Sequence, residues 1–278
     1  MSELDPLKVL RSQIDAMDDR LVALLNERSA LVIKIGKIKK KNNFHFHTPA
    51  REQAIYDRLT ANNLGPFPNE ALKHVFREIM GGSLSLEKKI RVAYWGQEAS
   101  LAHQACLQHF SASVLTLSVH CIQDVFEAIE KGETDFGVIP IEHSTDGIQN
   151  DTLDILVGSP LVIYSEILQK EHGTHNTIRF LVVSQKSSES TTRDKTSLVL
   201  SIKGNPDELY DLLKPFEQQE IHPLKINSKL SGHDRASCFY VDIAGNQNEE
   251  KIDCALKQIA KKALFLKVLG SYPMGGTK

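Results

Sequence analysis

The segment from Pro6 to about Lys41 constrains the fold of this chain more than any other. Apolar or conformable side chains recur along it in alternating steps of three and four, the spacing of one face of an α-helix. Pro6 suits the first turn of such a helix, where its missing N–H leaves no bond unmade. The pattern therefore predicts one long amphipathic helix. Its apolar stripe is formed by Leu7, Leu10, Ile14, Met17, Leu21, Leu24, Leu31, Ile35 and Ile38.

Arg28 interrupts this stripe, in the position between Leu24 and Leu31 where an apolar side chain is expected. A charge on a buried stripe is costly unless it is paired, so we expect Arg28 to meet an anion. Lys39 comes 11 residues later, which returns it to within about 20° of the same face and places it about 16 Å away. Two long side chains at this spacing can grip one small dianionic ligand.

Arg11 lies 17 residues before Arg28, about 25 Å along the helix. This is too far for both to share one small-molecule site within one chain. If Arg11 binds the ligand, it must serve the site of a partner subunit. The alternative from spacing alone is that Arg11, Arg28 and Lys39 are solvated charges on a coiled coil.

Two further helices are predicted after the first one. One runs from about Pro49 to Asn62, and the next begins near Asn69. Gly81 and Gly82 weaken the end of this third helix by about 1 kcal/mol each relative to alanine.

The pattern changes at Lys88, where strands begin to alternate with helices. A polar linker is expected at residues 187–195. After it, the predicted elements follow the order βαββαβ, which is the ferredoxin-like arrangement.

Composition limits the classes of function. With 278 residues, 41% of them hydrophobic, the chain can form two or three domains. A net charge of −2 gives no electrostatic case for nucleic acid or an anionic membrane as partner. The apolar runs are too short for a bilayer span and the N-terminus lacks a signal-peptide pattern, so we expect a cytoplasmic protein. The four scattered cysteines are expected to be buried thiols and suggest no zinc site or disulfide framework.

The first 88 residues closely resemble the all-helical chorismate mutase domain of the bifunctional chorismate mutase–prephenate dehydratases, or P-proteins. The resemblance rests on "LDPLKVLRSQIDAMDDRLVALLNERSALVIKIGKIKK", followed by "PAREQAIYDRL" and "FREIMGGSLSLE". It implies three helices in an intertwined homodimer that converts chorismate to prephenate in phenylalanine biosynthesis. It implies no cofactor and no metal.

The resemblance also implies the site residues. Arg11, reaching across from the partner subunit, and Arg28 would hold the two substrate carboxylates, while Lys39 would hydrogen-bond the ether oxygen. Glu52 would hold the ring hydroxyl with Arg51 nearby. Thr48 stands where some members carry aspartate. Ser83 and Glu87 would close the site from the third helix.

Residues 89–186 resemble a prephenate dehydratase domain that is shorter than in the family. "DFGVIPIEHSTDGIQNDTLDIL" is similar to the family's G-x-x-P-I-E-N-S-x-x-G, so Glu142, His143 and Ser144 take those positions, with histidine in place of asparagine. The signature N-x-T-R-F aligns with residues 176–180, which places Ile178 where a proton-donating threonine belongs. The other aligned residues are Thr177, Arg179 and Phe180.

The family places this active site between two α/β lobes, and the second lobe is missing here. Only residues 168–175 separate the end of the first lobe from the signature, whereas a lobe needs about 50 residues or more. A register slip that substituted Thr177 for Ile178 would turn the side chain to the opposite face of the strand. We therefore expect an inactive remnant.

Residues 194–274 resemble the ACT regulatory domain of P-proteins, above all in "FLKVLGSYP". The resemblance implies a site for L-phenylalanine at Asn205, Pro206, Asn227 and Ser228. Asn227, Lys229 and Leu230 depart from the family pattern, so phenylalanine inhibition is not expected.

Three hypotheses follow from the sequence. The first is an active chorismate mutase with a dehydratase remnant and an ACT domain. The second is a complete bifunctional enzyme that makes phenylpyruvate. The third is a pseudo-enzyme that only binds a ligand or partner.

Overall fold

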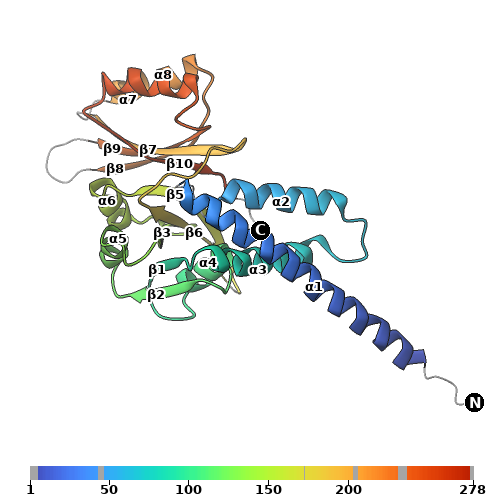
Figure 1. Ribbon diagram of the computed structural model, residues 1–278. Helices are drawn as coiled ribbons and strands as arrows, with labels where there is room; N and C mark the ends of the chain where they lie inside the picture. The colour runs from blue at the N-terminus through green and yellow to red at the C-terminus, as the bar shows by residue number, and fades with distance from the viewer. Residues whose placement is uncertain (1–5, 43–46, 172, 203–205, 231–236, 276–278) are drawn as a thin grey trace, which may run out of the picture.

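The helical part, the α/β part and the C-terminal sheet follow one another along the chain and lie side by side in space (Figure 1). The structure is a computed structural model and describes residues 6–42, 47–171, 173–202, 206–230 and 237–275.

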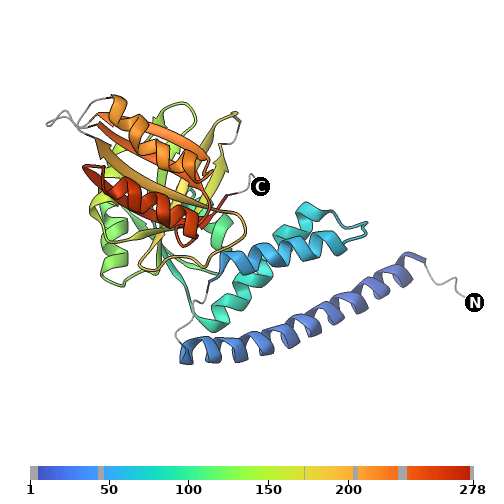
Figure 2. The ribbon, with the colours of Figure 1, turned by 90° about the horizontal axis from the view of Figure 1, so that it is seen from above.

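The N-terminal part consists of α1 (Pro6–Lys41), α2 (Pro49–Asn62) and α3 (Asn69–Glu87), which confirms the three predicted helices. α1 and α2 both pack against α3. The N-terminal half of α1 extends away from the rest of the chain, as Figures 1 and 2 show. Its apolar stripe is consequently exposed in a single chain.

Gly81 has a packing role that its low helix propensity does not reveal. α3 continues through both glycines to Glu87. A Cβ atom at Gly81 would lie 1.7 Å from the side-chain oxygen of Ser111, so only glycine allows α3 to approach the end of α4 (Leu101–Phe110) this closely. The helical part and the α/β part of the molecule are in contact at this point.

The α/β part forms a six-stranded sheet in the order β2-β1-β3-β6-β5, with β4 paired to β3. β1 pairs in parallel with β2 and β3, and β6 is antiparallel to β3 and β5. The predicted alternation of strands with helices is confirmed, while α4 and α6 were not identified individually from the sequence. The elements are β1 (Arg91–Trp95), α4 (Leu101–Phe110), β2 (Leu115–Val119), α5 (Ile122–Glu130), β3 (Phe136–His143), β4 (Gly147–Ile148), α6 (Asn150–Gly158), β5 (Val162–Lys170) and β6 (Thr177–Ser184).

The C-terminal part has the predicted ferredoxin-like topology. Its four strands lie in the order β10-β7-β9-β8, all neighbours antiparallel, with both helices on one face. The elements are β7 (Asp194–Ile202), α7 (Pro206–Gln218), β8 (Pro223–Leu230), β9 (Ser237–Ala244), α8 (Glu250–Ala260) and β10 (Phe265–Pro273).

The linker prediction is wrong at its end. Asp194 and Lys195 are not linker residues, because both belong to β7 and are buried. The Asp194 carboxylate accepts hydrogen bonds from Ser190, Thr191 and Asn246, which ties the preceding segment to the sheet. The polar run is therefore a linker only up to Arg193, and its last two residues belong to a buried strand.

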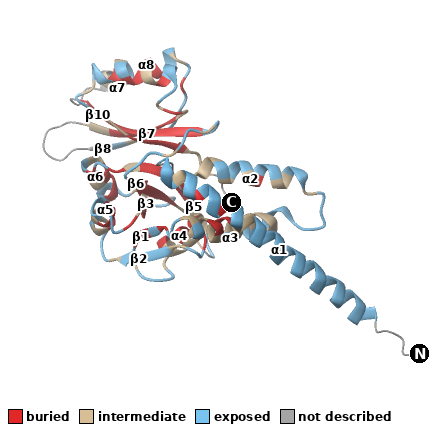
Figure 3. Cartoon of the chain, in the orientation of Figure 1, coloured by how far each residue is buried: buried red, intermediate tan, exposed pale blue. Residues whose placement is uncertain are grey.

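The ferredoxin-like sheet packs directly on the α/β sheet. One hydrophobic core continues from Ile163 and Leu181 in the α/β sheet to Val199, Leu269 and Tyr272 in the ferredoxin-like sheet. Figure 3 shows that both sheets are buried where they meet. α7 and α8 cover the other face of the ferredoxin-like sheet, so all nine residues of β7 are buried.

Gly270 lies where these two sheets come closest. Its φ is +156°, and a Cβ atom there would be 2.5 Å from the carbonyl oxygen of Ile163. A register shift between Val268 and Gly270 marks a bulge in β10 at this point. The bulge and the missing side chain allow β10 to lie against β5.

The prediction of buried cysteines is correct for Cys106 and wrong for Cys121 and Cys254, which are exposed; all four are free thiols. Cys121 is exposed because it occupies the N-cap of α5. In the described ranges, the structure contains no helix that is both long enough and apolar enough to cross a bilayer.

Candidate functional site

The predicted mutase residues converge on one cavity of about 440 Å³ among the three N-terminal helices. Seven of them line it: Arg28, Lys39, Thr48, Arg51, Glu52, Ser83 and Glu87. Val32, Ile55, Met80 and Leu84 supply its apolar walls. A small, open cavity that is lined by charged groups from several elements suits one small polar ligand.

Three cationic side chains line this cavity. Arg28 and Lys39 come from α1, as their helical spacing predicted, and Arg51 comes from the first turn of α2. Burial, and next the positive charge of Arg51, lower the pKa of Arg28. Two guanidinium groups that repel one another in this way favour the binding of an anion between them.

Ser83 orients the Arg28 guanidinium. Arg28 Nη1 donates a hydrogen bond to Ser83 Oγ, and the Ser83 hydroxyl donates to the carbonyl oxygen of Ile79 at 2.7 Å. The buried hydroxyl thus connects α1 to α3 at the cavity.

Lys39 and Glu87 form an ion pair across the cavity, with Lys39 Nζ 3.2 Å from Glu87 Oε2. The Glu87 side chain is only 8% exposed. Both groups reach the same point of the cavity, so both can act on one atom of a bound ligand.

Thr48 occupies the N-cap of α2 without using its hydroxyl for the cap. Its carbonyl oxygen accepts the N–H groups of Arg51 and Glu52 at 3.0 and 3.2 Å. The hydroxyl of Thr48 is therefore not committed to the helix terminus.

Arg11 does not line this cavity. It lies on the exposed N-terminal half of α1, in agreement with the distance argument. If Arg11 contributes to a mutase site, that site belongs to another copy of the chain.

Two cavity residues were missed by the sequence analysis. His47 comes from the connection between α1 and α2, and Glu189 comes from the segment after β6. Residues 188–190 are held to the ferredoxin-like sheet, since Ser188 Oγ donates to the carbonyl oxygen of Ser271 at 3.2 Å. No local pattern marks either residue, because each reaches the cavity through tertiary packing.

The dehydratase motifs lie on β3 and β6, where Arg179 is buried in an ionic cluster. Its guanidinium lies 2.8 Å from Glu166 and 2.9 Å from Asp242, and donates to the hydroxyls of Tyr240 and Tyr272 at 3.2 and 3.0 Å. Burial lowers the pKa of Arg179, but the two tyrosines and two acids outweigh it and raise that pKa overall.

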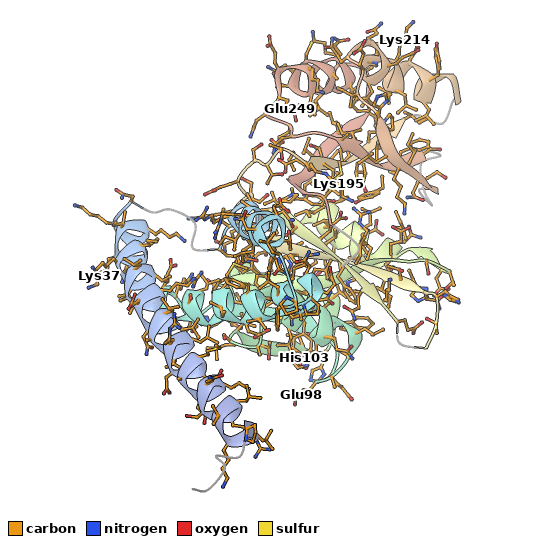
Figure 4. The ribbon with its side chains drawn as sticks, turned by 90° about the vertical axis from the view of Figure 1, so that its right-hand side faces the viewer. Lys37, Glu98, His103, Lys195, Lys214 and Glu249 are labelled. Atoms are coloured by element: carbon orange, nitrogen blue, oxygen red, sulfur yellow. The ribbon has the colours of Figure 1, made fainter. Side chains whose placement is uncertain are left out.

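Lys195 belongs to the same cluster, with Nζ 2.5 Å from Glu166 and 3.6 Å from Asp242. Figure 4 labels Lys195 where the ferredoxin-like sheet meets the α/β part. Two cations and two buried carboxylates are therefore paired between the two sheets. The guanidinium of Arg179 is occupied by groups of the chain itself.

The residues next to Arg179 have other surroundings. Ile178 packs against the apolar cluster that contains Phe180, and Thr177 exchanges hydrogen bonds with Ser144 through N–H groups. Thr177 lies two residues from Arg179 and shares its face of β6, whereas Ile178 lies on the other face.

The residues of β3 are also engaged. Glu142 pairs with Lys225 of β8, and the Arg179 guanidinium lies 3.8 Å from it. His143 Nδ1 lies 2.7 Å from Thr145 Oγ1. The ferredoxin-like domain thus provides partners for both Arg179 and Glu142.

The residues predicted to bind phenylalanine are only partly described. Asn205 lies outside the described residues, and Pro206 begins α7. Asn227 and Ser228 are on the edge strand β8, and Asn227 Nδ2 has no hydrogen-bond partner among the described residues. A separate cavity of about 570 Å³ lies between α7 and the start of β8, and neither Asn227 nor Ser228 lines it.

Within the described ranges, no group of three or more histidine, cysteine, aspartate or glutamate side chains is placed to hold a metal ion.

Two family models match the chain in succession. Chorismate mutase type II matches residues 10–88, and prephenate dehydratase matches residues 92–174. The second match ends before β6 and its arginine.

Known proteins with both domains match nearly the whole chain. The bifunctional chorismate mutase/prephenate dehydratase of Aquifex aeolicus (strain VF5) is 32% identical, over 97% of this chain and 98% of the relative. That alignment spans 356 positions although this chain has 278 residues, so the relative contains segments that have no counterpart here.

Solved structures match the C-terminal two thirds. Prephenate dehydratase from Streptococcus mutans is 27% identical and superposes with a TM-score of 0.60, over 67% of this chain and 100% of that chain. The prephenate dehydratase of Arthrobacter aurescens in complex with L-Phe, at 17% identity, shares the fold with a TM-score of 0.59, over 66% of this chain and 90% of that chain. The two family models and the full-length relative lead to one conclusion: the chain belongs to the bifunctional chorismate mutase/prephenate dehydratase family.

Proposed function

We propose that this protein is a chorismate mutase that converts chorismate to prephenate and whose dehydratase-like part is inactive. The observation that carries the proposal is the convergence of Arg28, Lys39, Arg51, Glu52 and Glu87 on one cavity. The relative from Aquifex aeolicus is named for both activities.

The reaction that we propose is an intramolecular pericyclic rearrangement, so it needs no nucleophile and no proton transfer. It is accelerated by a clamp that folds the enolpyruvyl arm over the ring, and by hydrogen bonds to the ether oxygen as its bond to carbon breaks. Arg28 would hold one carboxylate through its planar fork, since a guanidinium matches a carboxylate with two parallel hydrogen bonds.

Lys39 Nζ and Glu87 Oε2 lie 3.2 Å apart, so both groups can contact the ether oxygen of one bound substrate. An ether oxygen only accepts hydrogen bonds, so Glu87 contributes when it is protonated and donates. Glu52 would hold the ring hydroxyl, with Arg51 next to it in the chain.

The second carboxylate would be held by Arg11 of the partner subunit in a homodimer. Ile14, Met17 and Leu21 on the projecting half of α1 are 56%, 59% and 57% exposed in a single chain. Burying one such side chain contributes about 1.5–3 kcal/mol, so a second copy packed along the stripe is strongly favoured. Such a dimer would bring Arg11 to the other cavity.

Mixing two inactive variants tests this arrangement. Arg11→Ala and Arg28→Ala should each abolish turnover as homodimers. A heterodimer of the two retains one intact site, built from Arg28 of one subunit and Arg11 of the other. After subunit exchange, an equimolar mixture should regain about a quarter of the wild-type activity. A mixture that stays inactive after exchange would show that Arg11 acts within its own chain or not at all.

The inactive dehydratase part is proposed from the surroundings of Arg179. Its guanidinium is paired with Glu166 and Asp242, and Ile178 has no proton to donate. The ferredoxin-like sheet lies against this face, which leaves Arg179 buried.

The specific alternative is a complete bifunctional enzyme, which the relatives' names favour. Purified full-length protein should be supplied with chorismate, and the loss of chorismate and the appearance of prephenate and phenylpyruvate followed. We expect prephenate to accumulate. Phenylpyruvate at an enzymatic rate would establish the alternative, and no loss of chorismate would leave a ligand-binding pseudo-enzyme. Ile178→Thr should not restore phenylpyruvate formation, because Arg179 stays paired.

We also propose that the ferredoxin-like domain is an ACT regulatory domain whose phenylalanine site has diverged. L-phenylalanine is bound by the dehydratase of Arthrobacter aurescens, which shares the fold. Isothermal titration with L-phenylalanine should give no saturable binding to this chain. Saturable binding together with inhibition of the mutase would overturn this part of the proposal.

A further inference from the structure

His47 is a buried residue of the mutase cavity that the family motifs do not include. It lies directly before Thr48, lines the cavity and is only 3% exposed. Its Nε2 lies 3.3 Å from Oε1 of Glu52, at ion-pair distance. Among the described residues, neither ring nitrogen has a partner in hydrogen-bond geometry. A polar ring buried in this state next to a carboxylate requires an explanation.

The His47 ring is held by the dehydratase-like part, not by the mutase helices. It packs at centroid distances of 5.6 Å from His109, 5.1 Å from Phe110, 5.8 Å from Phe136 and 5.8 Å from Tyr164. These rings come from α4, β3 and β5. The position of His47 is therefore decided by a different domain from the one whose cavity it lines.

Tyr164 also fixes the backbone at this point. Its hydroxyl donates a hydrogen bond of 2.5 Å to the carbonyl oxygen of His47. Burial, and next the charges of Glu189 and Glu52, raise the pKa of Tyr164, so its hydroxyl keeps the proton that it donates. Tyr164 thereby connects β5 to the residue that precedes α2.

We propose that His47 is a positioning residue of the mutase site, which orients the Glu52 carboxylate through Nε2 and is itself held in place by the dehydratase-like part. This inference rests on the proposed mutase function and gives the dehydratase-like part a role as scaffold. The route is continuous: Tyr164 and the aromatic cluster fix His47, His47 limits the rotation of Glu52, and Glu52 meets the substrate. Groups that orient the ligands of a metal site contribute about 10- to 100-fold to activity, and we expect an effect of the same order here.

Two substitutions of His47 separate a positioning role from a packing role. His47→Gln keeps an N–H donor near the place of Nε2 but removes the ring. His47→Phe keeps a ring in the aromatic cluster but removes the donor. A positioning role predicts that His47→Gln retains most of the wild-type kcat, while His47→Phe lowers kcat about 10- to 100-fold with a smaller change in KM. A packing role predicts the reverse order, with the lower Tm in His47→Gln.

The measurement is steady-state chorismate consumption by the full-length chain, with Tm recorded for each variant. Tyr164→Phe keeps the ring and removes the hydrogen bond to His47, so it should lower kcat several-fold. His74→Gln, at an exposed histidine of α3, is the matched control and should equal wild type. Equal activity of His47→Phe and wild type, equal impairment of both His47 variants, or an unaffected Tyr164→Phe would each overturn the inference. A wild-type chain that consumes no chorismate would instead refute the proposed mutase function.

Discussion

Two arginine sites of this chain differ in what surrounds the guanidinium. Arg28 lines an open cavity in which Arg51 is a second arginine. The Arg28 guanidinium donates a hydrogen bond to the Ser83 hydroxyl. Arg179 lies between two sheets, paired with two carboxylates and two tyrosine hydroxyls. Both arginines fall within the family motifs that the sequence resembles. These surroundings indicate that Arg28 can still bind the anionic group of a ligand. Arg179 is already paired with the carboxylates of Glu166 and Asp242.

Removing the cavity arginine should produce the largest change in activity. We expect Arg28→Ala to lower kcat/KM for chorismate by about 1,000-fold, on the order of 4 kcal/mol, because a buried carboxylate loses its bidentate partner. Arg28→Lys should recover little, since an ammonium cannot reproduce the fork. Steady-state kinetics measure the effect, and Tm should change little. Near-wild-type turnover in Arg28→Ala would remove the contrast between the two sites.

Removing the buried arginine should affect stability instead. We expect Arg179→Met to lower the free energy of unfolding by about 3 kcal/mol, because Lys195 is then the one cation among the described residues that pairs with Glu166 and Asp242. Denaturant titration measures this, with Arg193→Met at a neighbouring exposed arginine as control. If Arg179→Met were as stable as wild type but lost phenylpyruvate formation, Arg179 would be a substrate ligand after all.

Glu87 in the mutase cavity should make kcat/KM depend on pH. Glu87 donates to an ether oxygen only when protonated, so kcat/KM should rise toward acid pH, by up to about tenfold. Glu87→Gln carries a permanent donor and should flatten the profile. The comparison requires kcat/KM for both proteins between about pH 5 and 8. A flat wild-type profile over this range would remove Glu87 from the mechanism.

The smallest effect is expected at Glu189, which brings a negative charge from the segment after β6 to the mutase cavity. Because chorismate is a dianion, Glu189→Gln should lower KM about twofold. Glu189 is exposed, so this difference should shrink as salt is added. Glu127→Gln, on α5 and outside the cavity lining, serves as the control. An unchanged KM at low salt would show that this segment does not influence the site.

Much of the fold could be predicted because its signals are local. The recurrence of apolar residues every three or four positions predicted the bounds of α1. The order of the six C-terminal helices and strands predicted the ferredoxin-like topology. The helical spacing of Arg28 and Lys39 alone indicated that both side chains can contact one ligand, and both line the same cavity.

The polar side of β7 shows where this reasoning fails. Lys195 and Ser197 lie in the polar first half of β7, and residues of these types are mostly exposed in proteins. Both are buried, because that face meets the α/β sheet and Asp242 and Glu166 supply the counter-charges. The partners of an ionic cluster lie far apart along the chain, so a local pattern cannot indicate them.

The sequence by itself determined the three N-terminal helices, the order of the C-terminal elements, and which α1 residues share a face with Arg28. Helical and strand periodicity depends only on neighbouring residues, and the chain carries that information directly. The tertiary structure alone decided that Arg179 is sealed by the ferredoxin-like sheet and that His47 is held by Tyr164. These contacts depend on which faces of distant elements meet, and that is settled by packing of the whole chain.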